Sequence, residues 1–205
     1  MVRVGTGITD DGASLRSTKA GIVQQQDQGK KVWILSQQKR YIPSLYDPVI
    51  GIVVNRYSDH YEVDIGAPFL ALLPVLAFDN ATRRNRPNLK EGDAVYCRVD
   101  AAHRDLQPTV TCLTSDGPSG PSTGLGPLKD GFIVQCGTGV AKQLLSTPPP
   151  SFISSLVNKS PSGFELAVGL NGLVWVQSSA QPGSSDALST VILVKQALEK
   201  ASDVS

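Results

Sequence analysis

Short runs of aliphatic and β-branched residues, separated by turn residues, occupy the middle of the chain. The runs cover residues 49–57, 61–65, 71–78, 94–99 and 108–113. Runs of this length and composition are typical of β-strands. Residues 89–93, Leu-Lys-Glu-Gly-Asp, have the composition of a turn before the fourth run. About five short strands in roughly 70 residues match the size of an OB-type barrel, so the pattern predicts a closed all-β unit over residues 45–115.

The C-terminal part of the chain has a pattern that mixes strands and helices. Two apolar runs flank Asn171-Gly172, a dipeptide that favours a tight hairpin because both positions tolerate positive φ. The last amphipathic segment follows Ser184-Ser185-Asp186, whose side-chain oxygens can cap the first turn of a helix. The expected elements are a strand at 131–136, helices at 140–145 and 151–157, strands at 164–168 and 173–177, and this last helix. The order β-α-α-β-β-α is that of a KH-like domain of the eukaryotic type.

Clusters of Pro, Gly and Ser mark domain boundaries near residues 43–48 and 115–129. The second cluster is too rich in breakers to predict a helix or a strand. The N-terminal segment contains short alternating runs such as Lys31–Leu35, which predict small strands, but it is too short to bury much of a core by itself. We therefore expect a multi-domain β and α+β protein. Its predicted parts are an N-terminal β segment at 1–44, a β-barrel at 45–115 and a KH-like domain at 116–205.

The composition is that of a globular protein, because 40% of the 205 residues are hydrophobic and 18% are charged. No run approaches the roughly 18 to 20 apolar residues of a membrane span, and the start of the chain lacks the hydrophobic run of a signal peptide. The three cysteines, Cys97, Cys112 and Cys136, have no pairing pattern, which favours a reducing compartment. These features predict a soluble intracellular protein without a membrane partner.

The chain carries fragments of catalytic motifs, but none of them is complete. His103-Arg104-Asp105 matches part of a kinase catalytic loop without the other kinase motifs, and Gly137-Thr138-Gly139 lacks the third glycine of a dinucleotide loop. The acidic residues Asp59, Glu62 and Asp64 come from one hairpin, whereas a two-metal nuclease site needs acids that converge from separate elements. Two histidines and three dispersed cysteines do not have zinc-ligand spacing. We therefore expect no catalytic residue, no metal site and no cofactor.

A basic cluster stands out in residues 81–88, Ala-Thr-Arg-Arg-Asn-Arg-Pro-Asn, although the formal net charge of the whole chain is only +1. The planar guanidinium groups of Arg83, Arg84 and Arg86 suit phosphate oxygens, but they suit the carboxylates of a protein partner equally well. Both interpretations stay open from the residues alone. The position of the cluster on a barrel beside a KH-like domain favours nucleic acid.

Gly169-Leu170-Asn171-Gly172 has the form of the GXXG loop with which KH domains hold a nucleic-acid backbone. That loop belongs between the first two helices, where this chain has Thr147-Pro148-Pro149-Pro150, and prolines remove backbone N–H donors. The glycine motif lies instead at the hairpin between two strands. Its position predicts a turn, or a close approach of another part of the backbone.

The order of these segments resembles that of the cap subunits of the RNA exosome, over roughly residues 20–205. The residues that carry the resemblance are the 81–88 cluster and the GxNG sequence followed by Leu173-Val174-Trp175-Val176. The resemblance implies an S1-type barrel and a non-catalytic subunit that stabilises a ring of RNase PH-like proteins, beside other cap subunits. It also implies that such a subunit lines the entry path of single-stranded RNA for 3′-5′ processing and degradation, in the nucleus and nucleolus and also in the cytoplasm. Gly169, Asn171, Gly172 and Trp175 would form a structural interface between barrel and KH domain.

The chain departs from the S1 pattern at Glu62, because S1-type barrels often have an aromatic residue immediately before the Val-Asp-Ile-Gly run. A carboxylate cannot stack on a base, so we expect contacts to the RNA backbone, which carry little sequence information. The candidate RNA-binding residues are Arg56, Tyr57, Arg83, Arg84, Arg86, Lys90 and Arg104. The alternatives are a free-standing RNA-binding regulator that uses the same barrel and, much more weakly, a small nuclease.

Overall fold

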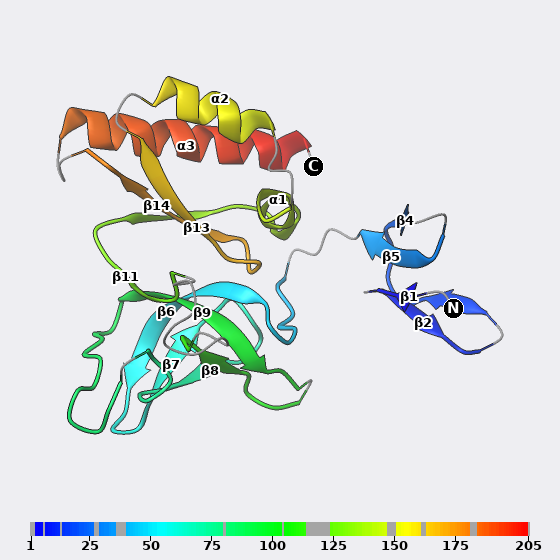
Figure 1. The fold of residues 1–205 in the computed structure, drawn as a ribbon, viewed down its shortest axis with the longest axis horizontal. Helices are drawn as coiled ribbons and strands as arrows, with labels where there is room; N and C mark the ends of the chain where they lie inside the picture. Colours follow the sequence, from blue (N-terminus) through cyan, green and yellow to red (C-terminus); the bar gives the residue numbers. More distant parts are fainter. Residues whose placement is uncertain are drawn as a thin grey trace. The chain divides into compact units, whose positions relative to one another are not determined.

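The computed structural model of the chain describes residues 3–5, 7–12, 14–26, 29–35, 40–79, 81–103, 105–113, 124–146, 151–160, 163–180 and 184–204 (Figure 1). The chain divides into two compact units, Met1–Lys39 and Arg40–Ser205. Among the described residues, no helix has both the length and the apolar character needed to span a bilayer.

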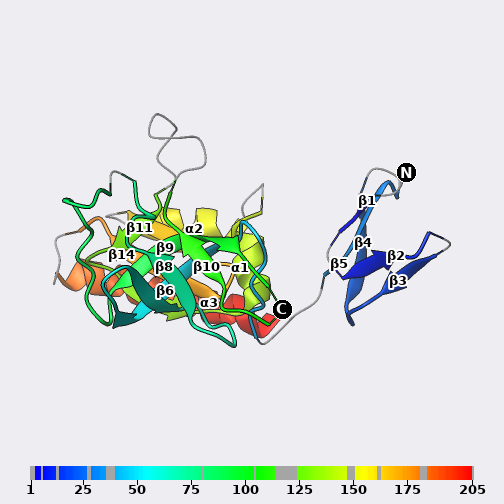
Figure 2. The same cartoon turned by 90° about the horizontal axis from the view of Figure 1, so that it is seen from below.

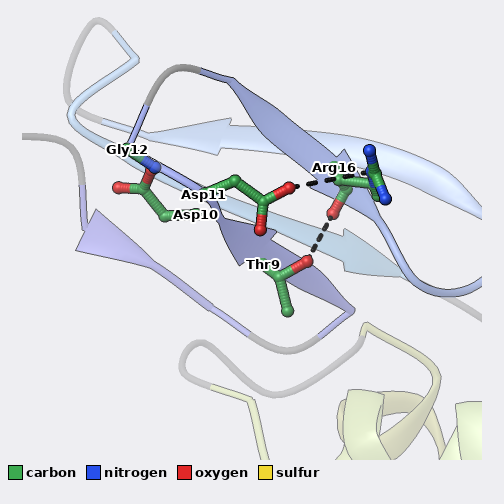
Figure 3. Close-up of polar contacts among 5 residues, drawn as sticks. All are labelled: Thr9, Asp10, Asp11, Gly12 and Arg16. Atoms are coloured by element: carbon green, nitrogen blue, oxygen red, sulfur yellow. Dashed lines mark hydrogen bonds and ion pairs between the residues drawn. The ribbon is translucent and has the colours of Figure 1, made fainter.

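The first unit consists of short strands: β1 (Arg3–Val4), β2 (Ile8–Asp10), β3 (Leu15–Ser17), β4 (Ile22–Gln26) and β5 (Lys31–Leu35). The strand order β1-β5-β4 forms one sheet, and β2 pairs with β3 in a separate hairpin. Figure 3 shows the polar contacts of this hairpin, where the Arg16 guanidinium lies 3.7 Å from the Asp11 carboxylate and the Asp10 side chain accepts the Gly12 N–H at 2.8 Å. These contacts are exposed, so they define the turn and add little stability.

The second unit begins with the barrel, which is built from β6 (Pro48–Arg56), β7 (His60–Asp64), β8 (Ala71–Pro74), β9 (Ala94–Ala101) and β10 (Thr109–Thr111). The strand order is β10-β8-β7-β6-β9, and β10 also pairs with β9, which closes the barrel (Figure 2). Alternate residues of the strands fill its interior, with Val49, Val63, Leu73, Val95 and Val99 completely buried. The predicted closed all-β unit is confirmed.

The KH domain follows, with β12 (Phe132–Gln135), α1 (Thr138–Leu144), α2 (Ser151–Lys159), β13 (Phe164–Val168), β14 (Leu173–Ser178) and α3 (Ser185–Val204). Its antiparallel sheet has the order β12-β14-β13. Figure 1 shows α2 and α3 along one face of this sheet, with the barrel on the opposite side. Val174 and Val176 of β14 pack with Val194 and Leu198 of α3 in a separate hydrophobic core. The predicted order β-α-α-β-β-α is confirmed.

The prediction that residues 115–129 contain no strand is wrong, because β11 (Gly126–Leu128) lies within them. This strand pairs antiparallel with β9, with Gly126 opposite Tyr96. β11 is the last strand of its sheet, where Pro127 can be accommodated because no further strand needs its missing N–H. Residues 115–123 of the same stretch lie outside the described ranges.

Candidate nucleic-acid interface

The arginine loop, residues 81–88, lies in the connection between β8 and β9 and is held by hydrogen bonds within the loop and to the barrel. The Thr82 N–H donates to the Asn85 carbonyl at 3.0 Å, and the Asn85 N–H donates to Thr82 Oγ1 at 3.0 Å. At the C-terminal end of the loop, the buried Tyr61 hydroxyl of β7 donates to the Pro87 carbonyl. A buried residue of the barrel therefore holds the C-terminal end of the loop.

Arg86 differs from the other two arginines because its guanidinium bonds within the chain. Its Nε donates to the Arg83 carbonyl at 3.3 Å and its Nη1 donates to the Ser58 carbonyl at 3.0 Å. The second bond joins the arginine loop to the turn between β6 and β7. Arg86 thus holds the loop against the barrel.

Arg83 and Arg84 are exposed. In the part of the chain that the structure describes, neither side chain makes a hydrogen bond or an ion pair. Two guanidinium groups on a braced loop can bind phosphate oxygens without first leaving an internal partner.

A cleft of about 290 Å³ lies beside the loop and brings together three of the candidate residues, Arg56, Tyr57 and Arg86. The Arg56 Nη1 donates to Asn88 Oδ1 at 2.6 Å. The Tyr57 ring stacks on the His60 ring with centroids 4.7 Å apart, and Tyr57 remains 48% exposed. The cleft therefore combines cationic groups with an accessible aromatic ring, a combination that suits single-stranded nucleic acid.

The remaining candidates lie elsewhere. Lys90 is exposed in the turn before β9, where its backbone N–H donates to Asp93 Oδ2 at 2.8 Å, and it does not line the cleft. Arg104 lies outside the described residues. Glu62, at the position where S1-type barrels often have an aromatic residue, accepts a hydrogen bond from Asn55 Nδ2 at 2.7 Å.

The hairpin of residues 169–172 contacts the barrel directly. The Leu170 N–H donates to the Pro48 carbonyl at 2.8 Å. The Asn171 Nδ2 donates to the carbonyls of Ile50 at 2.7 Å and Ile65 at 3.0 Å, and its Oδ1 accepts the Ile50 N–H at 3.3 Å. A single side chain thus satisfies backbone groups of β6 and of the end of β7.

Both glycines of the hairpin lie against other parts of the backbone. A Cβ atom on Gly169 would lie 2.7 Å from the Ile50 nitrogen, and one on Gly172 would lie 2.5 Å from the Cys136 carbonyl oxygen. Gly172 also has φ +82°, a conformation that favours glycine. Residues 147–150, at the position that the nucleic-acid clamp has in KH domains, lie outside the described ranges.

Trp175 is 7% exposed and lies between Ile133 and Ala167 in the KH sheet. Its neighbours Val174 and Val176 face the helices, so alternation places Trp175 on the opposite face. A Cβ atom on Gly131 would collide with its indole ring. The ring is thus enclosed by backbone on the barrel side of the sheet.

Three further residues, Tyr96, Tyr41 and Asp47, make hydrogen bonds that had no signal in the sequence. The Tyr96 hydroxyl of β9 donates to the Val168 carbonyl at 3.2 Å, and the Tyr41 hydroxyl donates to Asp47 Oδ2 at 2.9 Å. Burial raises the pKa of Asp47, while the Tyr41 bond and the charge of Lys142 in α1 oppose that rise. The Tyr96 bond joins the barrel to the KH domain across 72 residues, whereas Tyr41 and Asp47 are only six residues apart in the chain.

Within the described residues, no group of three or more His, Cys, Asp or Glu side chains is placed to hold a metal ion. Burial raises the pKa of Cys97 to about 12 and that of Cys136 to about 11, so both thiols are protonated at neutral pH. A protonated thiol is a poor nucleophile and a poor metal ligand.

Comparisons with known proteins agree with this architecture. The family model "Exosome complex component RRP40, S1 domain" matches residues 41–126, and a KH domain model matches residues 131–182. The exosome complex component rrp40 of Schizosaccharomyces pombe is 38% identical over 96% of this chain and 79% of its own length. The RRP40 proteins of Saccharomyces cerevisiae and Homo sapiens are 35% and 34% identical, over 86% and 85% of this chain and 75% and 63% of their own lengths.

A solved structure described as an exosome complex RNA-binding protein shares the fold, with a TM-score of 0.58 and 24% identity over 79% of this chain and 87% of its own. A closed S1-type barrel joined to a KH domain through a buried hairpin places the chain in the class of S1–KH proteins. The sequence identity to several relatives, which extends over most of both chains, identifies one family within this class. The chain belongs to the RRP40 family of exosome complex components.

Proposed function

We propose that the chain is a non-catalytic, RNA-binding cap subunit of the RNA exosome. In this role it stabilises the ring of RNase PH-like subunits together with other cap subunits, and it lines the entry path of single-stranded RNA. The pathway would be 3′-5′ processing and degradation, including that of ribosomal RNA, in the nucleus, the nucleolus and the cytoplasm. The observation that carries the proposal is the braced arginine loop, in which Arg86 donates to the Ser58 carbonyl while the exposed side chains of Arg83 and Arg84 bond to none of the described residues.

The arginine loop supports contacts to phosphates and not to bases. Guanidinium groups bind phosphate oxygens in any sequence context, and such contacts position a strand without reading its bases. Glu62 is held by Asn55 on the barrel surface and cannot stack on a base. A surface of this kind suits an entry path through which RNAs of many sequences pass.

The N-terminal unit supports attachment to a partner. Among its described residues the buried hydrophobic ones are Val32 and Ile34, whereas Leu15, Ile22 and Val23 are 44%, 66% and 55% exposed. A unit below about 40 residues rarely forms a sufficient core alone. Apolar residues that stay exposed on such small sheets are typical of protein-binding surfaces, and the ring is the partner we propose for them.

A reconstitution experiment tests the proposal. The wild-type chain and an Arg83→Ala/Arg84→Ala variant are assembled with the ring and the other cap subunits, and the binding of a single-stranded RNA is measured. We expect equal assembly and weaker RNA binding of the variant. Normal RNA binding by the variant would contradict the role of the loop, and failed assembly would assign the loop to a protein partner.

The free-standing regulator remains the second candidate, because the barrel and loop would serve it equally well. Size-exclusion chromatography of a native extract distinguishes the two. A cap subunit elutes with a large complex, whereas elution only at the 21.7 kDa of the chain would contradict the complex.

Incubation of the purified chain with RNA and magnesium or phosphate should release no nucleotides. Nucleotide release that is lost on Asp64→Asn would contradict a non-catalytic role.

A further inference from the structure

The segment that leads into β6 makes a tight turn at residues 44–47, which we call the Tyr46 turn. The N–H of its last residue, Asp47, donates to the carbonyl of its first residue at 3.2 Å. The Tyr46 N–H donates to the Val99 carbonyl of β9 at 2.9 Å, and the Asp47 carboxylate accepts the Tyr41 hydroxyl at 2.9 Å. The turn is therefore held against the barrel by backbone and side-chain bonds.

Tyr46 occupies the third position of this turn with φ +68°. Glycine or asparagine is preferred at such a position, because most side chains crowd their own backbone at positive φ. Asp130 is the other non-glycine residue with positive φ in the part of the chain that the structure describes, and aspartate tolerates this conformation better than bulky residues do. A tyrosine at a glycine position costs folding stability, and strain of this kind is found at positions that serve a function.

The Tyr46 ring is presented to solvent with one face covered. Tyr46 is 64% exposed, and the guanidinium carbon of Arg98 in β9 lies 5.7 Å from the centroid of its ring. Among the described residues, no other aromatic ring stacks on Tyr46. An aromatic ring that is backed by a guanidinium and accessible on its other face is a stacking surface for a nucleic-acid base.

The charges around the Tyr46 turn are mixed. Arg98 is cationic, and the exposed Lys142 of α1 lies near enough to Asp47 for its charge to act on that carboxylate. Asp100, two residues further along the same face of β9, is an exposed carboxylate. Because the carboxylate weakens the attraction of the cations for phosphate, the ring is the feature that distinguishes this site from the arginine loop.

The Tyr46 turn and the arginine loop lie at opposite ends of β6. The turn directly precedes Pro48, the first residue of the strand, and Arg56, the last, bonds to Asn88 of the arginine loop. The 9 residues of β6, at about 3.3 Å each, give a length of roughly 30 Å. OB folds bind about 4–16 nucleotides of a single strand, so an extended RNA that follows the barrel reaches both ends.

We propose that the Tyr46 turn binds a base of single-stranded RNA, which stacks on the accessible face of the Tyr46 ring while Arg98 supports the other face. Stacking of this kind tolerates every base, so the site adds affinity without sequence preference. The inference rests on the proposed RNA-binding function, but not on the arginine loop, which contributes no residue to the turn.

A protein partner is the alternative occupant, because Leu45 beside the ring is 50% exposed. An apolar contact alone needs neither an aromatic residue at positive φ nor a guanidinium behind its ring. The strained position of Tyr46 and its contact with Arg98 therefore favour the base.

An oligonucleotide without bases tests the stacking contact on the full chain. The wild type is titrated with an oligouridine of about 12 nucleotides and with an abasic oligonucleotide of the same length. We expect tighter binding of the oligouridine. Tyr46→Gly should weaken oligouridine binding about fivefold or more and leave the binding of the abasic strand unchanged, whereas Tyr46→Phe should bind both as the wild type does.

Melting curves separate this role from a structural one. Glycine relieves the strain at positive φ, so Tyr46→Gly should melt at the temperature of the wild type or higher although it binds RNA more weakly. Phe132→Ala is the matched control, because Phe132 is 51% exposed in the KH sheet and should not contribute to the preference for bases. Arg83→Ala/Arg84→Ala should weaken the binding of both oligonucleotides and keep their ratio.

Two results would overturn the inference and leave the proposed RNA-binding function intact. One is that Tyr46→Gly binds oligouridine as tightly as the wild type, and the other is that the wild type binds both oligonucleotides equally. Normal RNA binding of Tyr46→Gly with impaired assembly into the ring would assign the turn to a protein partner. A wild-type chain that binds neither oligonucleotide, alone or in the assembled complex, would contradict the proposed function as well.

Discussion

Asn171 bonds to the backbone of Ile50 with both ends of its side-chain amide, donating to the carbonyl at 2.7 Å and accepting the N–H at 3.3 Å. An amide side chain here replaces the peptide group of a neighbouring strand. Ile50 is completely buried, so these backbone groups depend on Asn171 for their hydrogen bonds. The third bond, to the Ile65 carbonyl at 3.0 Å, extends the contact to the end of β7.

Asn171→Asp should therefore destabilise the chain. The carboxylate keeps an acceptor for the Ile50 N–H but lacks the donor for two carbonyls, and a buried group without its partner costs about 1–3 kcal/mol. Urea unfolding followed by tryptophan fluorescence measures the loss. Asn85→Asp is the control, because the Asn85 side chain is exposed in the arginine loop; equal stability of both variants would contradict the role of Asn171.

Gly172→Ala should lower the melting temperature by more than Gly66→Ala. Both glycines have positive φ, +82° and +70°, so both variants have backbone strain of about 1 kcal/mol or more. Only at Gly172 would the new Cβ also lie 2.5 Å from a carbonyl oxygen, since nothing lies within 4 Å of the Gly66 position. The difference between the two melting temperatures isolates the contact from the strain.

RNA binding of Gly172→Ala, measured on the same preparation, separates a turn from a clamp. If the glycine motif is a structural turn, RNA affinity per folded molecule stays unchanged while the melting temperature falls. Normal melting with lost RNA binding would mean that the motif holds nucleic acid.

Arg83→Ala/Arg84→Ala should make the salt dependence of RNA binding shallower, by about 1.4 units of log-log slope if each arginine neutralises one phosphate of a single strand. Arg86→Ala should change this slope less and should instead loosen the loop, because its guanidinium is engaged by the Ser58 and Arg83 carbonyls. Lys195→Ala on α3 controls for net charge. A slope change for Arg86→Ala as large as for the double variant would contradict the division of roles.

Asp47→Asn should become more stable than the wild type as the pH rises. Burial raises the pKa of Asp47, so the native chain holds this proton more tightly than the unfolded chain does. The stabilisation is fully present below the unfolded pKa of about 3.9 and is lost as the pH rises through the higher native value. Asparagine still offers an oxygen to the Tyr41 hydroxyl and the Ser44 N–H, which both bond to Oδ2 in the wild type.

Asp59→Asn provides a control, because its effect on stability should change with pH in the opposite direction. The hydrogen bond from His60 holds the pKa of Asp59 below its ordinary value, so its stabilisation is present above the unfolded pKa and is lost as the pH falls. Melting curves of both variants between about pH 4 and pH 7 should therefore diverge from the wild type in opposite directions. The same direction for both would contradict the assignment for Asp47.

Elements with a clear hydrophobic period could be predicted from the sequence, whereas contacts between distant segments could not. The barrel strands and the KH elements follow their periodicity, and β11 was missed because its pairing with β9 overrides a local preference for a turn. The position of Asn171 in a hairpin could be predicted from the sequence, but its hydrogen-bonding partners, the carbonyls of Ile50 and Ile65, lie 121 and 106 residues away. Arg83, Arg84 and Arg86 look equivalent in sequence, and only the Ser58 carbonyl, 28 residues from Arg86, distinguishes them.

Ile50 and Asn171 are 121 positions apart in the chain, and this separation sets the order in which their contact can form on the ribosome. At a synthesis rate of about 5–20 residues per second, Ile50 is made roughly 6–24 s before Asn171. During that interval the nascent barrel has water at the positions that the GxNG hairpin later occupies. The last strands of the KH domain therefore finish the barrel as well as their own sheet, and a nascent chain that stalls before Gly169 leaves both domains incomplete.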